Sequence, residues 1–471
     1  MKRTVAALVA LGVLLTVAAC RHSSQGNPLD GAYRFEQNGW IYVHLEGAPD
    51  RLGFQHGALL APEITDLLRV LKPYLQETTK RDWAFYRDAA ERILWPKIDA
   101  EYQAELDGIV AGARSKGVTL DRWDIVALNA LEELPYYYTS WLEKQQGKAP
   151  STSAPGNCSA FVATGSYTAD RRIVMGHNNW TNYVTGERWN IIFDLTPQRG
   201  FRIIMDGLPG VIVSDDDFGI NSNGVMVTET TITGFQGFDT AGTPEFFRAR
   251  KALQYSSSID DYVRIMRERN NGGYANDWLI GDNKTGEIAL FELGLKEWSL
   301  RRTADGYFVG SNFPVDPKLT AAETNFDVKD RGSSPNARRT RWEQLIAENK
   351  GKIDAEIGKR MESDAHDAFE RRQGPNERTL CGVVDNSPRG WPPDWGKFFP
   401  GGTVQAKVTD AQMASRMELF AAMGHPCAPD FQAEPFLAAH PEYGWMRGLL
   451  RDMKTQPWTL FSSAMTQPAT R

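Results

Sequence analysis

A polar stretch that ends at a single cysteine is the feature that most constrains this chain. Residues 143–157 are small, polar and rich in proline and glycine, and exposed linkers of this kind tolerate proteolysis. Cys158 follows directly, and the apolar run over 160–164 predicts a strand. A thiol at the start of a strand, at a break in the chain, predicts a nucleophile that self-cleavage exposes. The alternative is a buried structural cysteine.

The N-terminus carries the pattern of an export signal. Residues 1–3 form a basic n-region with Lys2 and Arg3, and the apolar run over 5–19 is too short for a comfortable membrane span. The run ends at Cys20, as in bacterial lipoprotein signals; a simple secretory peptide cut nearby is the alternative. We expect residues 1–20 to be the signal and acyl chains on Cys20 to hold the protein at a membrane surface. Because Arg21 follows rather than an aspartate, we expect the bacterial outer membrane, with the protein facing the periplasm.

The cysteine count supports a special role for Cys158. The chain has four cysteines, and disulfides persist in an oxidising envelope compartment. With Cys20 lipidated, three thiols remain, so one has no disulfide partner. Spacing does not fix the connectivity. Because Cys381 and Cys427 both lie in the C-terminal third, we expect these two to form the disulfide and Cys158 to keep its thiol.

Composition and patterning indicate a soluble α+β protein. The chain has 471 residues and a net charge of -6, which gives no basic footprint for nucleic acid. After a tail over 21–38, a strand is expected at 40–45 and helices over 56–142. Strands dominate after Cys158, with two helices between 243 and 269 and a charged helical stretch over 337–372. This order predicts two sheets layered between helices.

Several short blocks of the sequence form one ordered pattern. They are Asn157–Ala160, Gly176–Tyr183, Leu208–Gly210, Ser214–Phe218, Val227–Thr231, Asn276–Ile280 and Ser311–Pro314. This pattern resembles the phospholipase B-like proteins, which are N-terminal nucleophile hydrolases similar to the isopenicillin N acyltransferase group. Two further blocks, Gly53–Gly57 and Glu105–Ala113, look like the leader helices of that group.

The resemblance implies a fold, a processing event and an activity. The fold is a four-layer αββα core with two stacked antiparallel sheets, and the processing event is autocatalytic cleavage between Asn157 and Cys158. Residues 21–157 then form a tether and helical leader that stays associated with a catalytic core over 158–471. The freed α-amine, with an ordinary pKa of roughly 7.7–8.0, serves as base for its own thiol. The expected reaction is hydrolysis of an amide, or an ester, of a small acyl or lipid-like substrate through a thioester.

The resemblance also indicates residues that act on the nucleophile. His177 is expected beside Cys158, where it orients the amine or moves a proton. The alternative is a core histidine whose hydrogen bonds are satisfied. Thr230 or Thr231 is expected to bond the amine or the bound acyl group, although threonine is also an ordinary strand residue.

Acyl transfer also needs donors for the oxyanion. By the resemblance, Asn312 is the first candidate and Asn276 the second. An arginine completes the site, and among Arg338, Arg339 and Arg341 we select Arg339.

No metal or cofactor is expected from the sequence. The acidic run Asp215–Asp217 lacks the spacing of a calcium loop. The histidines other than His177 show no zinc-ligand spacing; they are His22, His44, His56, His366, His425 and His440. Two other functions stay open: acyl transfer to an amine acceptor, and a non-catalytic surface lipoprotein that uses the fold for binding.

Overall fold

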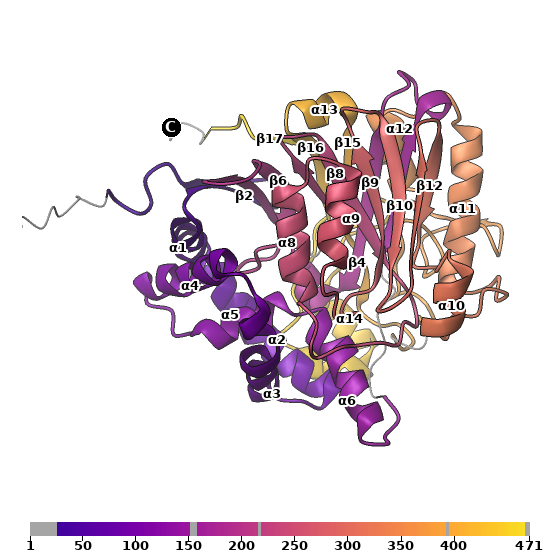
Figure 1. Cartoon of the computed structure of the whole chain (residues 1–471). Helices are drawn as coiled ribbons and strands as arrows, with labels where there is room; N and C mark the ends of the chain where they lie inside the picture. The colour runs from indigo at the N-terminus through magenta and orange to yellow at the C-terminus, as the bar shows by residue number, and fades with distance from the viewer. Residues whose placement is uncertain (1–25, 151–157, 215–217, 392–394, 467–471) are drawn as a thin grey trace, which may run out of the picture.

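The computed structural model describes residues 26–150, 158–214, 218–391 and 395–466 (Figure 1). The predicted signal with Cys20, the residue Asn157 and the acidic run Asp215–Asp217 lie outside the described residues. Within the described part, two large sheets stack on each other.

The larger sheet has nine strands in the described residues, and it includes two strands from the leader. Their spatial order is β1 (Tyr33–Gln37), β2 (Trp40–Gly47), β5 (Ile191–Pro197), β6 (Ile203–Gly207), β7 (Phe218–Asn221), β8 (Val225–Thr231), β9 (Asn276–Asp282), β10 (Glu287–Leu293) and β11 (Trp298–Thr303). The strand predicted at 40–45 is β2. The tail predicted over 21–38 is wrong in part, because β1 pairs with β2 at the edge of this sheet.

The smaller sheet carries Cys158 at the first residue of β3. Its order is β12 (Gly306–Gly310), β3 (Cys158–Thr164), β4 (Val174–Asn182), β15 (Gly401–Asp410), β16 (Glu418–Met423) and β17 (Thr459–Ser462). The pairs in both sheets are antiparallel, as predicted, with one exception among the described strands: β2 and β5 run parallel. A long stretch of chain, which includes the leader helices, separates these two strands, so a parallel crossover is possible.

Alternation along the strands explains how the sheets form one core. On β3, Ala160 and Val162 face the larger sheet, whereas Phe161 and Ala163 face the outer helices. Ile204, Met226 and Leu279 of the larger sheet lie in the same apolar cluster as Ala160 and Val162. Because both faces of β3 are covered, all of its residues are buried.

Helices cover both outer faces, which completes four layers. Helices α8 (Glu245–Tyr255) and α9 (Ile259–Arg267) pack on the larger sheet, and α11 (Ser334–Glu348) and α12 (Ala355–Glu362) pack on the smaller one (Figure 1). The ring of Trp342 on α11 contacts Phe161 of β3 at 5.4 Å between ring centroids. The αββα core predicted from the resemblance is therefore confirmed.

The leader helices form a compact group beside the sheets. They are α1 (Pro49–Leu59), α2 (Ala61–Thr79), α3 (Trp83–Ala89), α4 (Ala100–Ser115), α5 (Arg122–Asn129) and α6 (Thr139–Gln145). Helices α1 and α4 cross closely because glycines face each other: a Cβ at Gly53 would lie 1.9 Å from the Glu105 carbonyl oxygen, and one at Gly57 would lie 2.0 Å from that of Ile109. This crossing explains the two glycine-containing leader blocks of the sequence.

Short elements and one disulfide complete the described fold. The remaining elements include α7 (Tyr183–Gly186), α10 (Pro317–Glu323), α13 (Ala411–Ser415), α14 (Ala433–Ala439), β13 (His366–Asp367) and β14 (Arg372–Gln373). Cys381 and Cys427 form the expected disulfide, with their Cα atoms 6.0 Å apart. Among the described helices, none has the length and apolar character needed to cross a bilayer.

Candidate active site

The backbone of Cys158 is held by two side chains from the C-terminal half of the chain. Its nitrogen donates to Oδ1 of Asn312 at 3.0 Å, and its carbonyl oxygen accepts from Arg338. Asn312 has a φ of 69°, a conformation that asparagine tolerates better than most residues, and its amide nitrogen donates to the Thr231 carbonyl at 2.9 Å. Asn312 therefore lies at the site, as expected, but its oxygen faces the nucleophile. An oxygen acceptor can hold the N–H of an amine, whereas an oxyanion needs a donor.

Arg338 occupies the position that we had expected for Arg339. Its guanidinium donates to Ser159 Oγ at 3.0 Å and to Asn312 Oδ1 at 2.8 Å, and it lies 4.6 Å and 5.0 Å from the ring centroids of Trp180 and Trp391. Burial lowers the pKa of Arg338 to about 9, and the charge of Cys158 opposes that shift. The selection of Arg339 is wrong.

Arg339 points to a different neighbourhood because one residue turns a helix by about 100°. Its guanidinium lies over the ring of Phe313 and pairs with Glu343 at 3.1 Å, and 44% of its side chain is exposed. Arg341, the third arginine considered, pairs with Asp364 at 2.8 Å.

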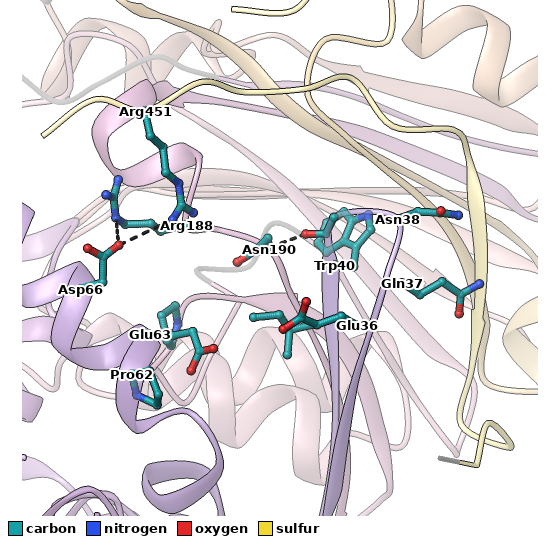
Figure 2. Close-up of a pocket in the computed structure, with 13 residues that line it drawn as sticks. Glu36, Gln37, Asn38, Trp40, Pro62, Glu63, Asp66, Arg188, Asn190 and Arg451 are labelled. Carbon is teal, nitrogen blue, oxygen red and sulfur yellow. Dashed lines mark hydrogen bonds and ion pairs between the residues drawn. The ribbon is translucent and has the colours of Figure 1, made fainter. Parts of the chain in front are cut away.

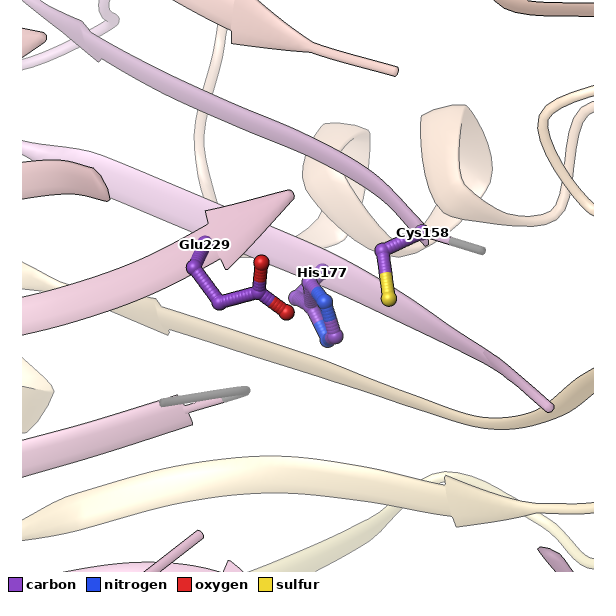
Figure 3. A group of neighbouring side chains, drawn as sticks. All are labelled: Cys158, His177 and Glu229. Atoms are coloured by element: carbon purple, nitrogen blue, oxygen red, sulfur yellow. The ribbon is translucent and has the colours of Figure 1, made fainter. Parts of the chain in front are cut away.

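His177 and Glu229 converge on the thiol from the two facing sheets (Figure 3). A ring nitrogen of His177, the sulfur of Cys158 and a carboxylate oxygen of Glu229 all lie within 4.8 Å of one another. His177 is on β4 and Glu229 on β8, and both are fully buried. Burial, and then the charge of Lys407, lower the pKa of His177 well below its usual value, so the imidazole is neutral at neutral pH. The placement of His177 beside Cys158 is as expected.

Sequence reasoning missed Glu229, although it stands in one of the resemblance blocks. Its carboxylate accepts from the Tyr274 hydroxyl at 3.0 Å and from the Asn276 amide nitrogen at 2.9 Å. Asn276, the second oxyanion candidate, is thus directed at this carboxylate. The signal in the sequence was a carboxylate in a buried strand, where charged residues are rare unless they are paired.

Thr230 lies close to the site but faces another strand. Its side chain is buried against Gly310, where an added Cβ would come within 2.3 Å of the Thr230 hydroxyl oxygen. The carbonyl oxygen of Thr231, the alternative, accepts a hydrogen bond from the Asn312 amide nitrogen.

Asn179 is a second residue that sequence reasoning missed. It pairs directly with Cys158 in the register of β3 and β4, and cross-strand neighbours point to the same face of a sheet. Only 2% of Asn179 is exposed, and its amide nitrogen has no hydrogen-bond partner among the described residues. A buried donor of this kind calls for a functional explanation.

A buried ion pair lies behind His177. Lys407 pairs with His177 in the register of β4 and β15, and its Nζ lies 2.9 Å from Oδ2 of Asp206. Gln405 donates to the same oxygen at 3.0 Å, and both charged side chains are fully buried. The charge of Lys407 contributes to the lowered pKa of the imidazole, and Asp206 offsets part of that charge.

A separate pocket lies between the β1–β2 hairpin and α2 (Figure 2). It has a volume of about 540 Å³, and its charged wall is built from ion pairs such as Arg188 with Asp66 at 2.6 Å. Cys158, His177 and Glu229 are not among its lining residues. This pocket is therefore separate from the site around Cys158.

Comparisons with known proteins agree with the resemblance read from the sequence. A family model of phospholipase B matches residues 63–289. Phospholipase B-like 1 of Bos taurus is 23% identical over 432 residues, which cover 79% of this chain and 75% of the bovine protein. An uncharacterized protein of Archaeoglobus fulgidus is 25% identical over 289 residues, which cover 56% of this chain and 45% of the archaeal one. The match thus spans less than half the length of the archaeal relative.

Among solved structures, a mutant of conjugated bile acid hydrolase from Clostridium perfringens is similar. The TM-score is 0.35 and the identity 11%, over 56% of this chain and 88% of that one.

Proposed function

The chain is a relative of the phospholipase B-like proteins, and from that premise we propose that it is a self-processing cysteine hydrolase of the N-terminal nucleophile type. The observation that carries the proposal is the pair of contacts on Cys158: its nitrogen donates to Asn312, and its carbonyl accepts from Arg338. The nitrogen that would become the catalytic amine is already held in a hydrogen bond. The thiol and a neutral His177 lie beside it.

Self-cleavage follows from the position of the thiol. The sulfur of Cys158 attacks the carbonyl carbon of Asn157, the bond to the Cys158 nitrogen breaks, and the thiol proton passes to that nitrogen. Water then hydrolyses the resulting thioester, which leaves a carboxylate on Asn157 and returns the thiol. The products are the leader and a core that begins with a free amine.

Turnover repeats these steps on a substrate. The α-amine takes the thiol proton, the thiolate attacks the acyl carbonyl, and the oxyanion of the tetrahedral intermediate needs a donor. The Asn179 amide nitrogen, directly opposite Cys158, is the donor that we assign to it. The leaving amine departs with the proton from the α-ammonium, and water then releases the acid from the thioester. Arg338 holds the Cys158 carbonyl during these steps.

The leader is proposed to stay with the core after cleavage. Strands β1 and β2 belong to the larger sheet, so their loss would expose an edge of the core. Buried polar contacts cross the junction as well: Asn129 donates to the Gly210 carbonyl at 2.9 Å, and Arg250 lies 3.3 Å from Glu105. Both strand pairing and these contacts keep the two fragments together.

The substrate class is proposed to be an acyl amide, with the ester as the second candidate. The thioester route serves either bond, and the names of the phospholipase B-like relatives favour the ester. A lipid anchor on Cys20 would place the enzyme at the outer membrane, facing the periplasm, close to lipid-like substrates.

A direct test compares an N-acyl amide and the matched acyl ester, each with a fluorogenic leaving group. We expect the wild-type enzyme to release the fluorophore from the substrate. We also expect an acyl adduct on the Cys158 peptide when the reaction is quenched in acid. Cys158→Ala should show neither signal. A wild-type protein that binds acyl chains but forms no adduct and no product would instead be a binding module. Acyl transfer would appear as an N-acylated product when an amine acceptor is added.

A further inference from the structure

Three side chains of the kinds that bind zinc meet at the nucleophile (Figure 3). Cysteine sulfur, histidine nitrogen and a carboxylate oxygen are the usual protein ligands of Zn²⁺. Cys158, His177 and Glu229 offer one of each, with these atoms within 4.8 Å of one another. We propose that these three residues form a zinc site that masks the nucleophile and reversibly inhibits the enzyme.

The distances require only a small adjustment. A tetrahedral zinc ion with bonds of about 2.0–2.3 Å holds its ligand atoms roughly 3.5 Å apart, so the three donors need to close in by about 1 Å. The sulfur of Cys158 and the ring of His177 are at the ends of side chains on strands, so rotation about their side-chain bonds supplies this movement.

Processing would supply the fourth ligand. The α-amine and the thiolate of an N-terminal cysteine close a five-membered chelate ring around a metal. Before cleavage the same nitrogen is a peptide amide that donates to Asn312, and a peptide N–H is not a ligand. This step rests on the proposed function, and it predicts that the processed chain binds zinc more tightly than the unprocessed one.

Neighbouring groups orient the ligands in the way that metal sites require. Hydrogen bonds from neighbouring groups fix the orientation of ligating side chains in metal sites. Tyr274 and Asn276 each donate to a carboxylate oxygen of Glu229, at 3.0 Å and 2.9 Å. These contacts hold the carboxylate in place beside the thiol.

The charges near the site are balanced for a cation. Asp206, 2.9 Å from Lys407, offsets part of the Lys407 charge, and Arg338 is directed at the Cys158 carbonyl and Asn312. The thiolate and the Glu229 carboxylate add two negative charges. Zinc binding releases the thiol proton to solvent, so the affinity should rise with pH.

The test uses the processed protein, stripped with a chelator and titrated with ZnCl₂ by calorimetry. We expect one zinc ion per chain, protection of Cys158 from alkylation, and loss of hydrolysis that a chelator restores. Cobalt(II) in place of zinc should give a thiolate charge-transfer band. Glu229→Gln keeps the shape of the side chain and should weaken zinc binding at least tenfold. Glu362→Gln is the control, because this buried carboxylate packs against the other face of β4 and should leave the affinity unchanged.

The outcomes separate this inference from the proposed function. An active, processed enzyme that binds no zinc, or binds it equally well after Cys158→Ser and Glu229→Gln, overturns the zinc site alone. An unprocessed chain that binds one zinc ion through all three residues supports the site and contradicts the proposed function.

Discussion

The backbone nitrogen of Cys158 and Oδ1 of Asn312 are 3.0 Å apart, and this oxygen also accepts from Arg338 at 2.8 Å. The contact joins the first residue of β3 to a residue 154 positions later, after the end of β12. An acceptor at this point holds the peptide N–H before cleavage and an amine after it. It therefore serves processing and turnover alike.

Asn312→Ala should slow self-cleavage and substrate hydrolysis by about a hundredfold, because the amine loses the acceptor that orients it. Gel analysis of processing over time, together with steady-state rates, measures both effects. Asn223→Ala is the control, since Asn223 lies in a partly exposed turn and donates to the Ser257 carbonyl. Equal rates in the two variants would show that Asn312 takes no part in processing or hydrolysis.

Asn179→Ala should lower kcat by about 10²–10³, the usual loss when an oxyanion donor is removed, with little change in KM. Asn178→Ala is the matched control on the opposite face of β4: its amide donates to the Glu362 and Leu380 carbonyls, so stability should fall but kcat per folded molecule should not. An unchanged kcat in Asn179→Ala contradicts the assignment.

Arg338→Lys and Arg339→Lys should behave differently although the residues are adjacent. A lysine at 338 cannot reproduce the bonds to Ser159 and Asn312 or the contact with two tryptophan rings, so activity should drop about a hundredfold. Arg339→Lys should stay within about twofold of wild type, because its ion pair with Glu343 is at the surface. The ratio of kcat/KM between the variants is the measurement, and equal losses would count against the site.

The leader–core contact at His56 predicts a stability loss in acid. His56 accepts from the Gly210 nitrogen at 2.8 Å, and burial lowers its pKa to about 3 from the usual 6.5. Below pH 6.5 the unfolded chain binds a proton that the folded chain does not, so the free energy of unfolding falls by up to roughly 1.4 kcal/mol per pH unit. The loss should continue until about pH 3. His56→Gln should remove this slope in denaturant titrations between pH 7 and 4, and parallel curves for both proteins would contradict it.

The sequence predicted the αββα fold because the blocks that carry the resemblance are each contiguous in the chain. Strand β1 was missed because Tyr33–Gln37 is a half-buried edge strand without clear alternation. Glu229 and Asn179 were missed for another reason: their proximity to Cys158 arises from strand pairing and sheet stacking, which the chain order alone does not specify.

The choice between Arg338 and Arg339 was available in the sequence. Trp342, Leu345 and Ile346 mark the apolar face of α11, and residue 338 lies four, seven and eight positions before them. Those spacings place Arg338, and not Arg339, on the buried face. The polar overall composition of this stretch hides the apolar face.

Intact-mass spectrometry of the purified protein beside Cys158→Ala is the most direct test of the central claim. The account predicts two wild-type fragments that meet between Asn157 and Cys158 and stay together in native gel filtration, and one unbroken chain for the alanine variant. A wild-type protein that remains a single chain, or an alanine variant cut at the same bond, would contradict it.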